Sequence, residues 1–144
     1  MIDISNKNVI LRIATASGKV FLKSATIKRV REDRVEKGDV LTIARIAGTN
    51  AVKKVPDLIP LCHPIGINSV DFGFEVSQGF IKVMCTVKSF AKTGVEMEAL
   101  TGVSTALLNI WDVVKMYEKD EHGQYPNAKI SEIKVDKKIK KPNK

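Results

Sequence analysis

The stretch VDFGFEVSQGFIKVMCTV, residues 70–87, predicts the core of the fold. Apolar side chains alternate with polar or small ones on both sides of the turn-forming Ser77-Gln78-Gly79. These apolar residues are Val70, Phe72, Phe74 and Val76 before the turn, and Ile81, Val83, Cys85 and Val87 after it. Alternation with a period of two places such side chains on one face of a strand. The stretch therefore predicts an antiparallel hairpin with one buried face.

A long helical pattern follows, from about Val95 to Glu118. Its apolar stripe consists of Leu100, Val103, Leu107, Trp111 and Val114. Its opposite stripe is polar and consists of Glu98, Thr101, Thr105, Asn109 and Asp112. The 14 residues between Glu98 and Asp112 correspond to about 21 Å of helix, too far for one small ligand to touch both. If both carboxylates are functional, a neighbouring subunit is the simplest way to complete the site.

Shorter patterns complete the predicted fold. Residues 10–15 and 20–23 predict a hairpin around Ser17-Gly18, and Ser24 is a candidate cap for a short helix to Glu32. A second helix is expected from an Asp39 cap to about Val55. Three prolines argue against regular helix beyond it, at positions 56, 60 and 64.

Downstream, KSFAKTG, residues 88–94, is expected to be irregular, and Ile130, Ile133 and Val135 suggest a last edge strand. The 144 residues suit a single domain, with a loose basic tail from about residue 136. Interspersed strands and helices predict an α+β fold, a ferredoxin-like antiparallel sheet with helices packed on one face.

Composition and charge limit the classes of protein to which this chain could belong. The net charge of +8 points to an anionic partner, although many of the lysines lie in the tail KVDKKIKKPNK. Aromatic residues make up only 6%, and no nucleic-acid-binding motif is present, which favours a phosphorylated small molecule over nucleic acid. No apolar run and no leader pattern predict a membrane or secreted protein, so we expect a cytoplasmic one. Cys62 and Cys85 lack zinc-site or disulfide-framework spacing and are expected to be reduced.

Several polar side chains are candidates for chemistry, each with a simpler structural interpretation. His63 stands between Cys62 and Pro64, but neighbouring residues of an extended chain point to opposite sides, which argues against a Cys–His nucleophile pair. Glu96 and Glu98 lie near a helix start, where the helix dipole favours carboxylates for structural reasons. The lysines around the second helix are by default surface residues. The residues alone indicate a basic, oligomeric α+β domain with an anion-binding site.

Three segments carry a resemblance to a known family. KGDVLTIARIAGTNAVKK, DLIPLCHP and KTGVEMEALTGVSTALLNIWDVVK, in this order and spacing, closely resemble the MoaC family of cyclic pyranopterin monophosphate synthases, over roughly residues 1–119. The resemblance implies a lyase of molybdenum cofactor biosynthesis. Such an enzyme converts 3′,8-cyclo-7,8-dihydro-GTP to cyclic pyranopterin monophosphate and releases pyrophosphate. It also implies ferredoxin-like subunits in a homohexamer, a trimer of dimers with active sites at subunit interfaces.

The same resemblance assigns roles to residues of this sequence. Asp112 is the expected catalytic acid or base, with Lys115 and Lys53 assisting. The residues expected to bind substrate are Leu61, Cys62, His63, Met97 and Glu98, with Lys37 and Arg12 for the phosphates and Glu96 as a further candidate. A lysine crowded by cations would have a lowered pKa suited to proton transfer. No metal ligand and no resident cofactor is expected, and whether Mg²⁺ accompanies the triphosphate stays open.

One segment departs from the family pattern. A glycine-rich GGKSG-like segment is expected near the end, where this chain has KVDKKIKKPNK. Lys134, Lys137 or Lys138 could replace its charge. Two alternatives from other functional classes also remain: a nucleic-acid-binding module that uses the lysine tail, and a non-catalytic oligomer that binds a nucleotide or pterin.

Overall fold

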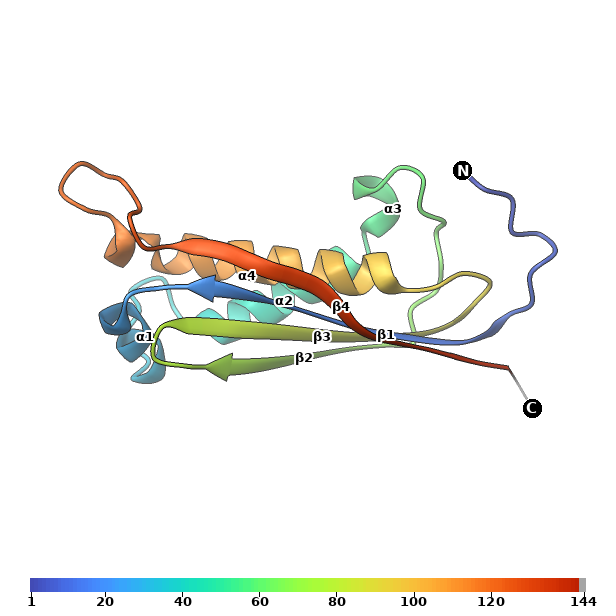
Figure 1. Ribbon diagram of the computed structural model, residues 1–144, viewed down its shortest axis with the longest axis horizontal. Helices are drawn as coiled ribbons and strands as arrows, with labels where there is room; N and C mark the ends of the chain where they lie inside the picture. Colours follow the sequence, from blue (N-terminus) through green and yellow to red (C-terminus); the bar gives the residue numbers. More distant parts are fainter. Residues whose placement is uncertain (143–144) are drawn as a thin grey trace.

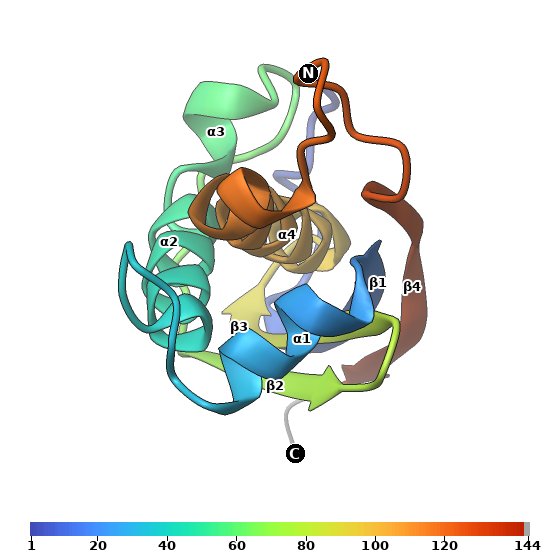
Figure 2. The same ribbon diagram turned by 90° about the vertical axis from the view of Figure 1, so that its left-hand side faces the viewer.

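The computed structural model describes residues 1–142 and consists of one antiparallel sheet with helices on one face (Figure 1). The elements are β1 (Ile10–Phe21), α1 (Ser24–Arg31), α2 (Val40–Val52), α3 (Val55–Leu58), β2 (Ser69–Val76), β3 (Phe80–Ala91), α4 (Glu96–Glu118) and β4 (Lys129–Lys141). The strand order is β2-β3-β1-β4. Seen end-on, α2 and α4 lie together on the same side of the sheet (Figure 2). The predicted ferredoxin-like α+β class is confirmed.

The predicted hairpin is β2 and β3. Phe72 pairs with Cys85 and Val70 with Val87, and the alternating side chains point into the core. β3 differs from the prediction at its end, because it continues through the expected irregular segment to Ala91, which pairs with Ile10. A partner strand along its whole length stabilises this extension beyond what the local sequence indicates.

The predicted first hairpin is wrong, because residues 10–21 form the single strand β1. Gly18 occupies the middle of that strand for a packing reason. A Cβ at this position would lie 2.8 Å from Leu107 Cδ1 and 3.1 Å from Val103 Cγ1, both on α4. The glycine lets the helix approach the sheet closely. A glycine inside a strand can mark such a close approach, and this one does not mark a turn.

The two longer predicted helices, which begin near Asp39 and Val95, are confirmed as α2 and α4, and they touch each other through glycine. The Asp39 side chain caps α2 by accepting a hydrogen bond from Thr42 N at 3.1 Å. A Cβ on Gly48 would collide with the Phe72 ring and lie 2.9 Å from the Gly102 carbonyl of α4. Small residues at this crossing allow the two backbones to approach each other.

The start of α1 is capped by a side chain from another helix. Ser24 is the first helical residue and not the cap that we predicted. Instead, the buried Glu118 carboxylate at the end of α4 accepts hydrogen bonds from Lys23 N, at 3.1 and 3.2 Å, and from the Thr26 hydroxyl. A carboxylate near a helix N-terminus satisfies unpaired N–H groups and suits the helix dipole.

Two further regions are more regular than predicted. Residues 55–58 form one helical turn. Pro56 is compatible with it, because it stands in the first turn, where a backbone N–H has no partner within the helix. The expected loose tail is a strand in the structure: β4 pairs with β1 as far as Lys141, opposite Leu11. The last tail residues, 143–144, lie outside the described part of the chain.

α4 lies across the sheet and contributes much of the core. Its fully buried residues include Val103, Leu107, Ile110 and Val114. One residue of the predicted polar stripe departs from the expectation, because Glu98 is only 4% exposed. It lines a pocket together with Leu61, Cys62 and His63 of the segment that precedes β2, a proximity that the helical pattern could not reveal. Within residues 1–142, no helix is both long and apolar enough to span a bilayer.

The contact between α2 and α4 predicts the effect of one substitution. Alanine favours a helix over glycine by about 1 kcal/mol, yet we expect Gly48→Ala to lower the free energy of unfolding by about 1–3 kcal/mol, because the added methyl overpacks the crossing. Urea denaturation measures the change. Gly79→Ala is the matched control, since a Cβ there meets nothing within 4 Å. Equal stability of the two variants would contradict the packing argument.

Candidate functional site

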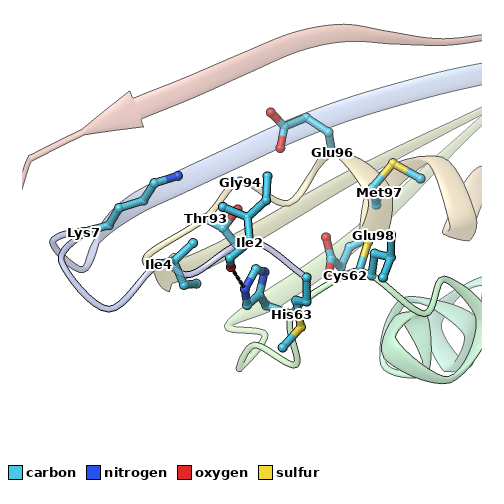
Figure 3. A pocket seen from close by; sticks show the side chains of 12 residues that line it. Ile2, Ile4, Lys7, Cys62, His63, Thr93, Gly94, Glu96, Met97 and Glu98 are labelled. Carbon is cyan, nitrogen blue, oxygen red and sulfur yellow. Dashed lines mark hydrogen bonds between the residues drawn. The ribbon is translucent and has the colours of Figure 1, made fainter.

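One pocket is lined by six of the predicted residues and lies at the end of the molecule where α4 begins; we call it the main pocket. It has a volume of about 440 Å³, large enough for a nucleotide-sized ligand. Its wall includes the predicted residues Leu61, Cys62, His63, Glu96, Met97 and Glu98, and it also includes Thr93, Gly94, Met1, Ile2, Ile4 and Lys7. Figure 3 shows the two groups of predicted residues on facing sides, one on the loop after α3 and one on the first turn of α4.

The loop that carries Leu61–His63 is held against β3. The buried Ser89 hydroxyl donates a hydrogen bond to the Gly66 carbonyl. Asn68 Oδ1 accepts from Phe90 N at 2.9 Å, and Asn68 N donates to the Lys88 carbonyl at 2.9 Å. An irregular segment fixed in this way keeps the pocket wall rigid although it lacks regular structure.

The two carboxyl groups at the start of α4 differ in proton affinity. Burial, reinforced by the charge of Glu96, raises the pKa of Glu98. Burial and the neighbouring Glu98 likewise raise the pKa of the Cys62 thiol. A protonated thiol is a poor nucleophile, whereas a carboxyl group that retains its proton can act as a general acid.

Glu96 is held in its ionised form by cations from two strands. Burial opposes its ionisation, but the Lys138 ammonium, with a smaller effect from Arg12, keeps the pKa of Glu96 below its ordinary value. Lys138 Nζ forms an ion pair with Glu96 Oε1. Arg12 Nη2 donates to the Lys92 carbonyl at 3.3 Å, and its buried Nε has no hydrogen-bond partner among residues 1–142. Both cations therefore adjoin Glu96, a residue of the pocket wall.

A second cluster lies further along α4. Asp112 Oδ1 is 3.0 Å from Lys115 Nζ, and Asp112 Oδ2 is 3.3 Å from Lys37 Nζ. Lys37 also donates to the Asp112 carbonyl at 2.9 Å. The two lysines, Lys115 foremost, lower the pKa of Asp112, and Asp112 raises the pKa of Lys115. The expected lowering of the lysine pKa is therefore not present in the single chain, where the pair lies at the surface and the Asp112 side chain is 58% exposed.

The structure keeps the two clusters apart. Glu98 and Asp112 lie on the same helix, so about 21 Å separates them along its axis. Lys53, at the end of α2, does not meet Asp112 either. Its neighbour Val52 packs against Gly102, about 15 Å of helix before Asp112. One chain therefore does not assemble the predicted catalytic set of Asp112, Lys115 and Lys53 around one point.

Several contacts at the site could not be predicted from the sequence. The tail lysines were candidates for replacing a missing charge, but the pairing of Lys138 with Glu96 depends on how β4 is aligned with β1. The Tyr117 hydroxyl accepts a hydrogen bond from Glu36 N at 2.9 Å, which fixes the loop that carries Lys37. His63 Nε2 lies 2.7 Å from the carbonyl oxygen of Ile2, drawn as a dashed line in Figure 3. No sequence signal could reveal this last contact, because it involves the backbone.

The described residues contain no cluster of three or more His, Cys, Asp or Glu side chains that could hold a metal ion. Cys62 and Cys85 are free thiols. Burial raises the pKa of Cys85 to about 12, so it is a core residue. The pocket wall itself carries carboxyl, imidazole and ammonium groups, which suit proton transfer and anion binding.

The raised pKa of Glu98 predicts how stability depends on pH. Between the ordinary glutamate pKa of 4.5 and the higher folded value, the native state binds more protons than the unfolded state. Stability therefore falls as pH rises through this window, and ionised Glu98 is destabilising above it. We expect Glu98→Gln to raise the free energy of unfolding at pH 7 and to lose this advantage below about pH 4.5. Urea denaturation across pH tests this, with the exposed Glu121→Gln as control, and a constant difference would contradict it.

Several known proteins are similar in sequence to this chain. A relative in Pyrococcus abyssi, named probable cyclic pyranopterin monophosphate synthase, is 55% identical over 97% of this chain and 88% of its own length. Relatives with the same name in Archaeoglobus fulgidus and Sulfolobus acidocaldarius are 56% and 51% identical over 97% of this chain, and over 90% and 98% of their own lengths.

A model of the MoaC family matches residues 1–140, nearly the whole chain and beyond the motifs that first carried the resemblance. The match includes the pocket wall, the Asp112 cluster and the strand that supplies Lys138. Both kinds of comparison therefore cover every element of the candidate site, and this chain belongs to the MoaC family.

Proposed function

We propose that this protein is a cyclic pyranopterin monophosphate synthase of molybdenum cofactor biosynthesis. It would convert 3′,8-cyclo-7,8-dihydro-GTP to cyclic pyranopterin monophosphate and release pyrophosphate. The family match and the names of its relatives support this assignment. The observation that carries it is the division of the acid–base groups into a carboxyl- and histidine-lined pocket and a separate Lys37–Asp112–Lys115 cluster.

We further propose that the active site forms between two copies of the chain. The pocket of one copy would face the Lys37–Asp112–Lys115 cluster of a second copy, in a homohexamer built as a trimer of dimers. The separation of about 21 Å along a rigid helix supports this, since one chain cannot close it. Burial of the exposed Asp112–Lys115 pair at such an interface would also move both groups away from their solvent-exposed pKa values.

The proposed chemistry suits these groups. Rebuilding the purine-derived ring system requires addition of water, cleavage of a ring bond and several proton transfers, for which Glu98, Asp112 and Lys115 are placed. Closing the cyclic phosphate expels pyrophosphate, and Arg12 and Lys138 would stabilise the developing charge.

The remaining predicted residues would support this chemistry. Lys37 would act beside Asp112, whereas Lys53 would join the site from the pocket end of α2. Leu61, Cys62, His63 and Met97 would contact the substrate, and Glu96 would hold Lys138 in place.

The proposal assigns no resident cofactor. Any Mg²⁺ would enter with the substrate phosphates, because the candidate carboxylates are engaged by protein cations or directed towards the pocket. We propose that the protein works in the cytoplasm, where nucleotide substrates are made.

A direct assay tests the function. The purified protein is incubated with 3′,8-cyclo-7,8-dihydro-GTP, and pyrophosphate release is measured against time. Release at a constant rate under multiple turnover supports the enzyme. Stoichiometric substrate binding without pyrophosphate would instead identify a non-catalytic oligomer, and salt-sensitive binding of a random oligonucleotide would favour the nucleic-acid alternative.

The assigned role of Asp112 predicts a selective loss of turnover. Asp112→Asn removes a proton-transferring group but keeps its shape, so we expect kcat to fall by about 10²–10⁴ while KM and the assembly size stay unchanged. Steady-state kinetics and size-exclusion chromatography measure these. Asp33→Asn, at an exposed loop position, is the control, and an Asp112→Asn enzyme with normal kcat would exclude the role.

The shared site predicts complementation between two variants that each retain only a small residual turnover. Mixing refolded His63→Ala and Asp112→Asn chains yields hybrid dimers with one intact site, so we expect about a quarter of the wild-type turnover from random pairing. Asp112→Asn mixed with Lys115→Ala is the control that must stay at a residual turnover, because both changes damage the same cluster. Absence of recovery in the first mixture would place the whole site within one chain.

A further inference from the structure

The first seven residues lie across the main pocket. This N-terminal strap, residues 1–7, contributes Met1, Ile2, Ile4 and Lys7 to the pocket wall. A second hollow of about 460 Å³ is lined by the strap together with His63 and Lys92. Figure 1 shows the strap at the same end of the molecule as α3 and the start of α4. The strap therefore lines two neighbouring hollows, and His63 contributes to both.

Backbone hydrogen bonds hold the strap in place. The Ile2 carbonyl bonds to His63 Nε2 at 2.7 Å, and the Ser5 carbonyl accepts from Lys92 Nζ at 2.9 Å. The strap keeps its own shape through Asp3 Oδ1, which accepts from Ser5 N at 2.8 Å. The Ile2 side chain is 78% exposed, so apolar packing cannot be the reason for its position.

The contact with Ile2 defines the chemical state of His63. A carbonyl oxygen can only accept a hydrogen bond, so the proton of a neutral ring must reside on Nε2. The other nitrogen, Nδ1, then carries the lone pair and is the one that accepts a hydrogen bond or a proton. In proteins, the partner of one imidazole nitrogen commonly determines the role of the other.

We propose that the N-terminal strap is a positioning element of the active site. The Ile2 carbonyl holds His63 as the Nε2–H tautomer and orients its ring, so that Nδ1 is the nitrogen presented to the substrate. This inference rests on the proposed function. It assigns a role to a backbone group outside the predicted site residues, and it makes the strap part of the substrate-binding wall.

The tautomer can be measured independently of turnover. ¹⁵N NMR of the histidine-labelled full chain, above the pH at which the rings titrate, distinguishes a fixed tautomer from an averaged one. His122 is an internal reference, because it lies outside the pocket and its one ion-pair contact, Nε2 to Glu121 Oε1 at 3.3 Å, lies between two side chains that are 75% and 85% exposed. We expect separate protonated and unprotonated nitrogen signals for His63 and averaged signals for His122. His122→Gln assigns the signals and should leave those of His63 unchanged.

Two variants release the strap in different ways. One begins the chain with a methionine directly before Ser5, and the other, Lys92→Met, removes the ammonium that binds the Ser5 carbonyl. We expect both to shift the His63 signals towards the averaged pattern of His122. The truncation should also lower kcat/KM by about tenfold, as expected for the loss of one hydrogen bond that orients a reacting group.

A further comparison separates positioning from general structural damage. In a His63→Ala background the truncation should change kcat/KM by less than about twofold, because the strap acts through His63. Averaged His63 signals in the full chain, or signals that truncation leaves unchanged, would overturn the inference. A rise in kcat/KM after truncation would also overturn it, since the strap would then obstruct the pocket. An inactive full chain with a fixed His63 tautomer would refute the proposed function but not the strap contact.

Discussion

The structure depends on the close approach of α4 to the sheet and to α2. Gly18 in β1 and Gly48 in α2 both lie where a side chain would strike α4 or its neighbours. Because protein interiors are close-packed, even one additional methyl group at such a crossing must displace backbone or ring atoms. The glycines therefore fix the height and direction of α4, and with them the positions of every functional group that the helix carries.

The site uses the two ends of this helix differently. At its start, Glu98 is buried and Glu96 is paired with Lys138, so two neighbouring carboxyl groups differ in proton affinity. Near its other end, Asp112 lies between two lysines at the surface. A straight helix holds these groups far apart, and packing against the sheet prevents them from approaching. In the active site that we propose, a second chain would therefore unite them.

The errors of the sequence analysis share one physical cause. Gly18 resembles a turn residue, but it is needed because α4 packs against it. Ser24 resembles a helix cap, but Glu118 of α4 caps this helix instead. In both cases the deciding contact comes from more than 80 residues away in the sequence. The tail of β4 resembles a solvated run of lysines because no local signal reports the pairing with β1. Local patterns predicted elements well where burial itself was periodic, as in β2, β3 and α4, and failed where a distant partner decided the outcome.

The fold class, the polar and apolar faces of the long helix and, through its motifs, the resemblance to a family could be recognised in the amino-acid order alone. Alternation and helical spacing are local consequences of backbone geometry, so they can be recognised without coordinates. The burial of Glu98, the pairing of Lys138 with Glu96 and the contact of the Ile2 carbonyl with His63 became visible only in the folded chain. These facts depend on strand register and on the path of irregular segments, which are set by packing between residues distant in the chain.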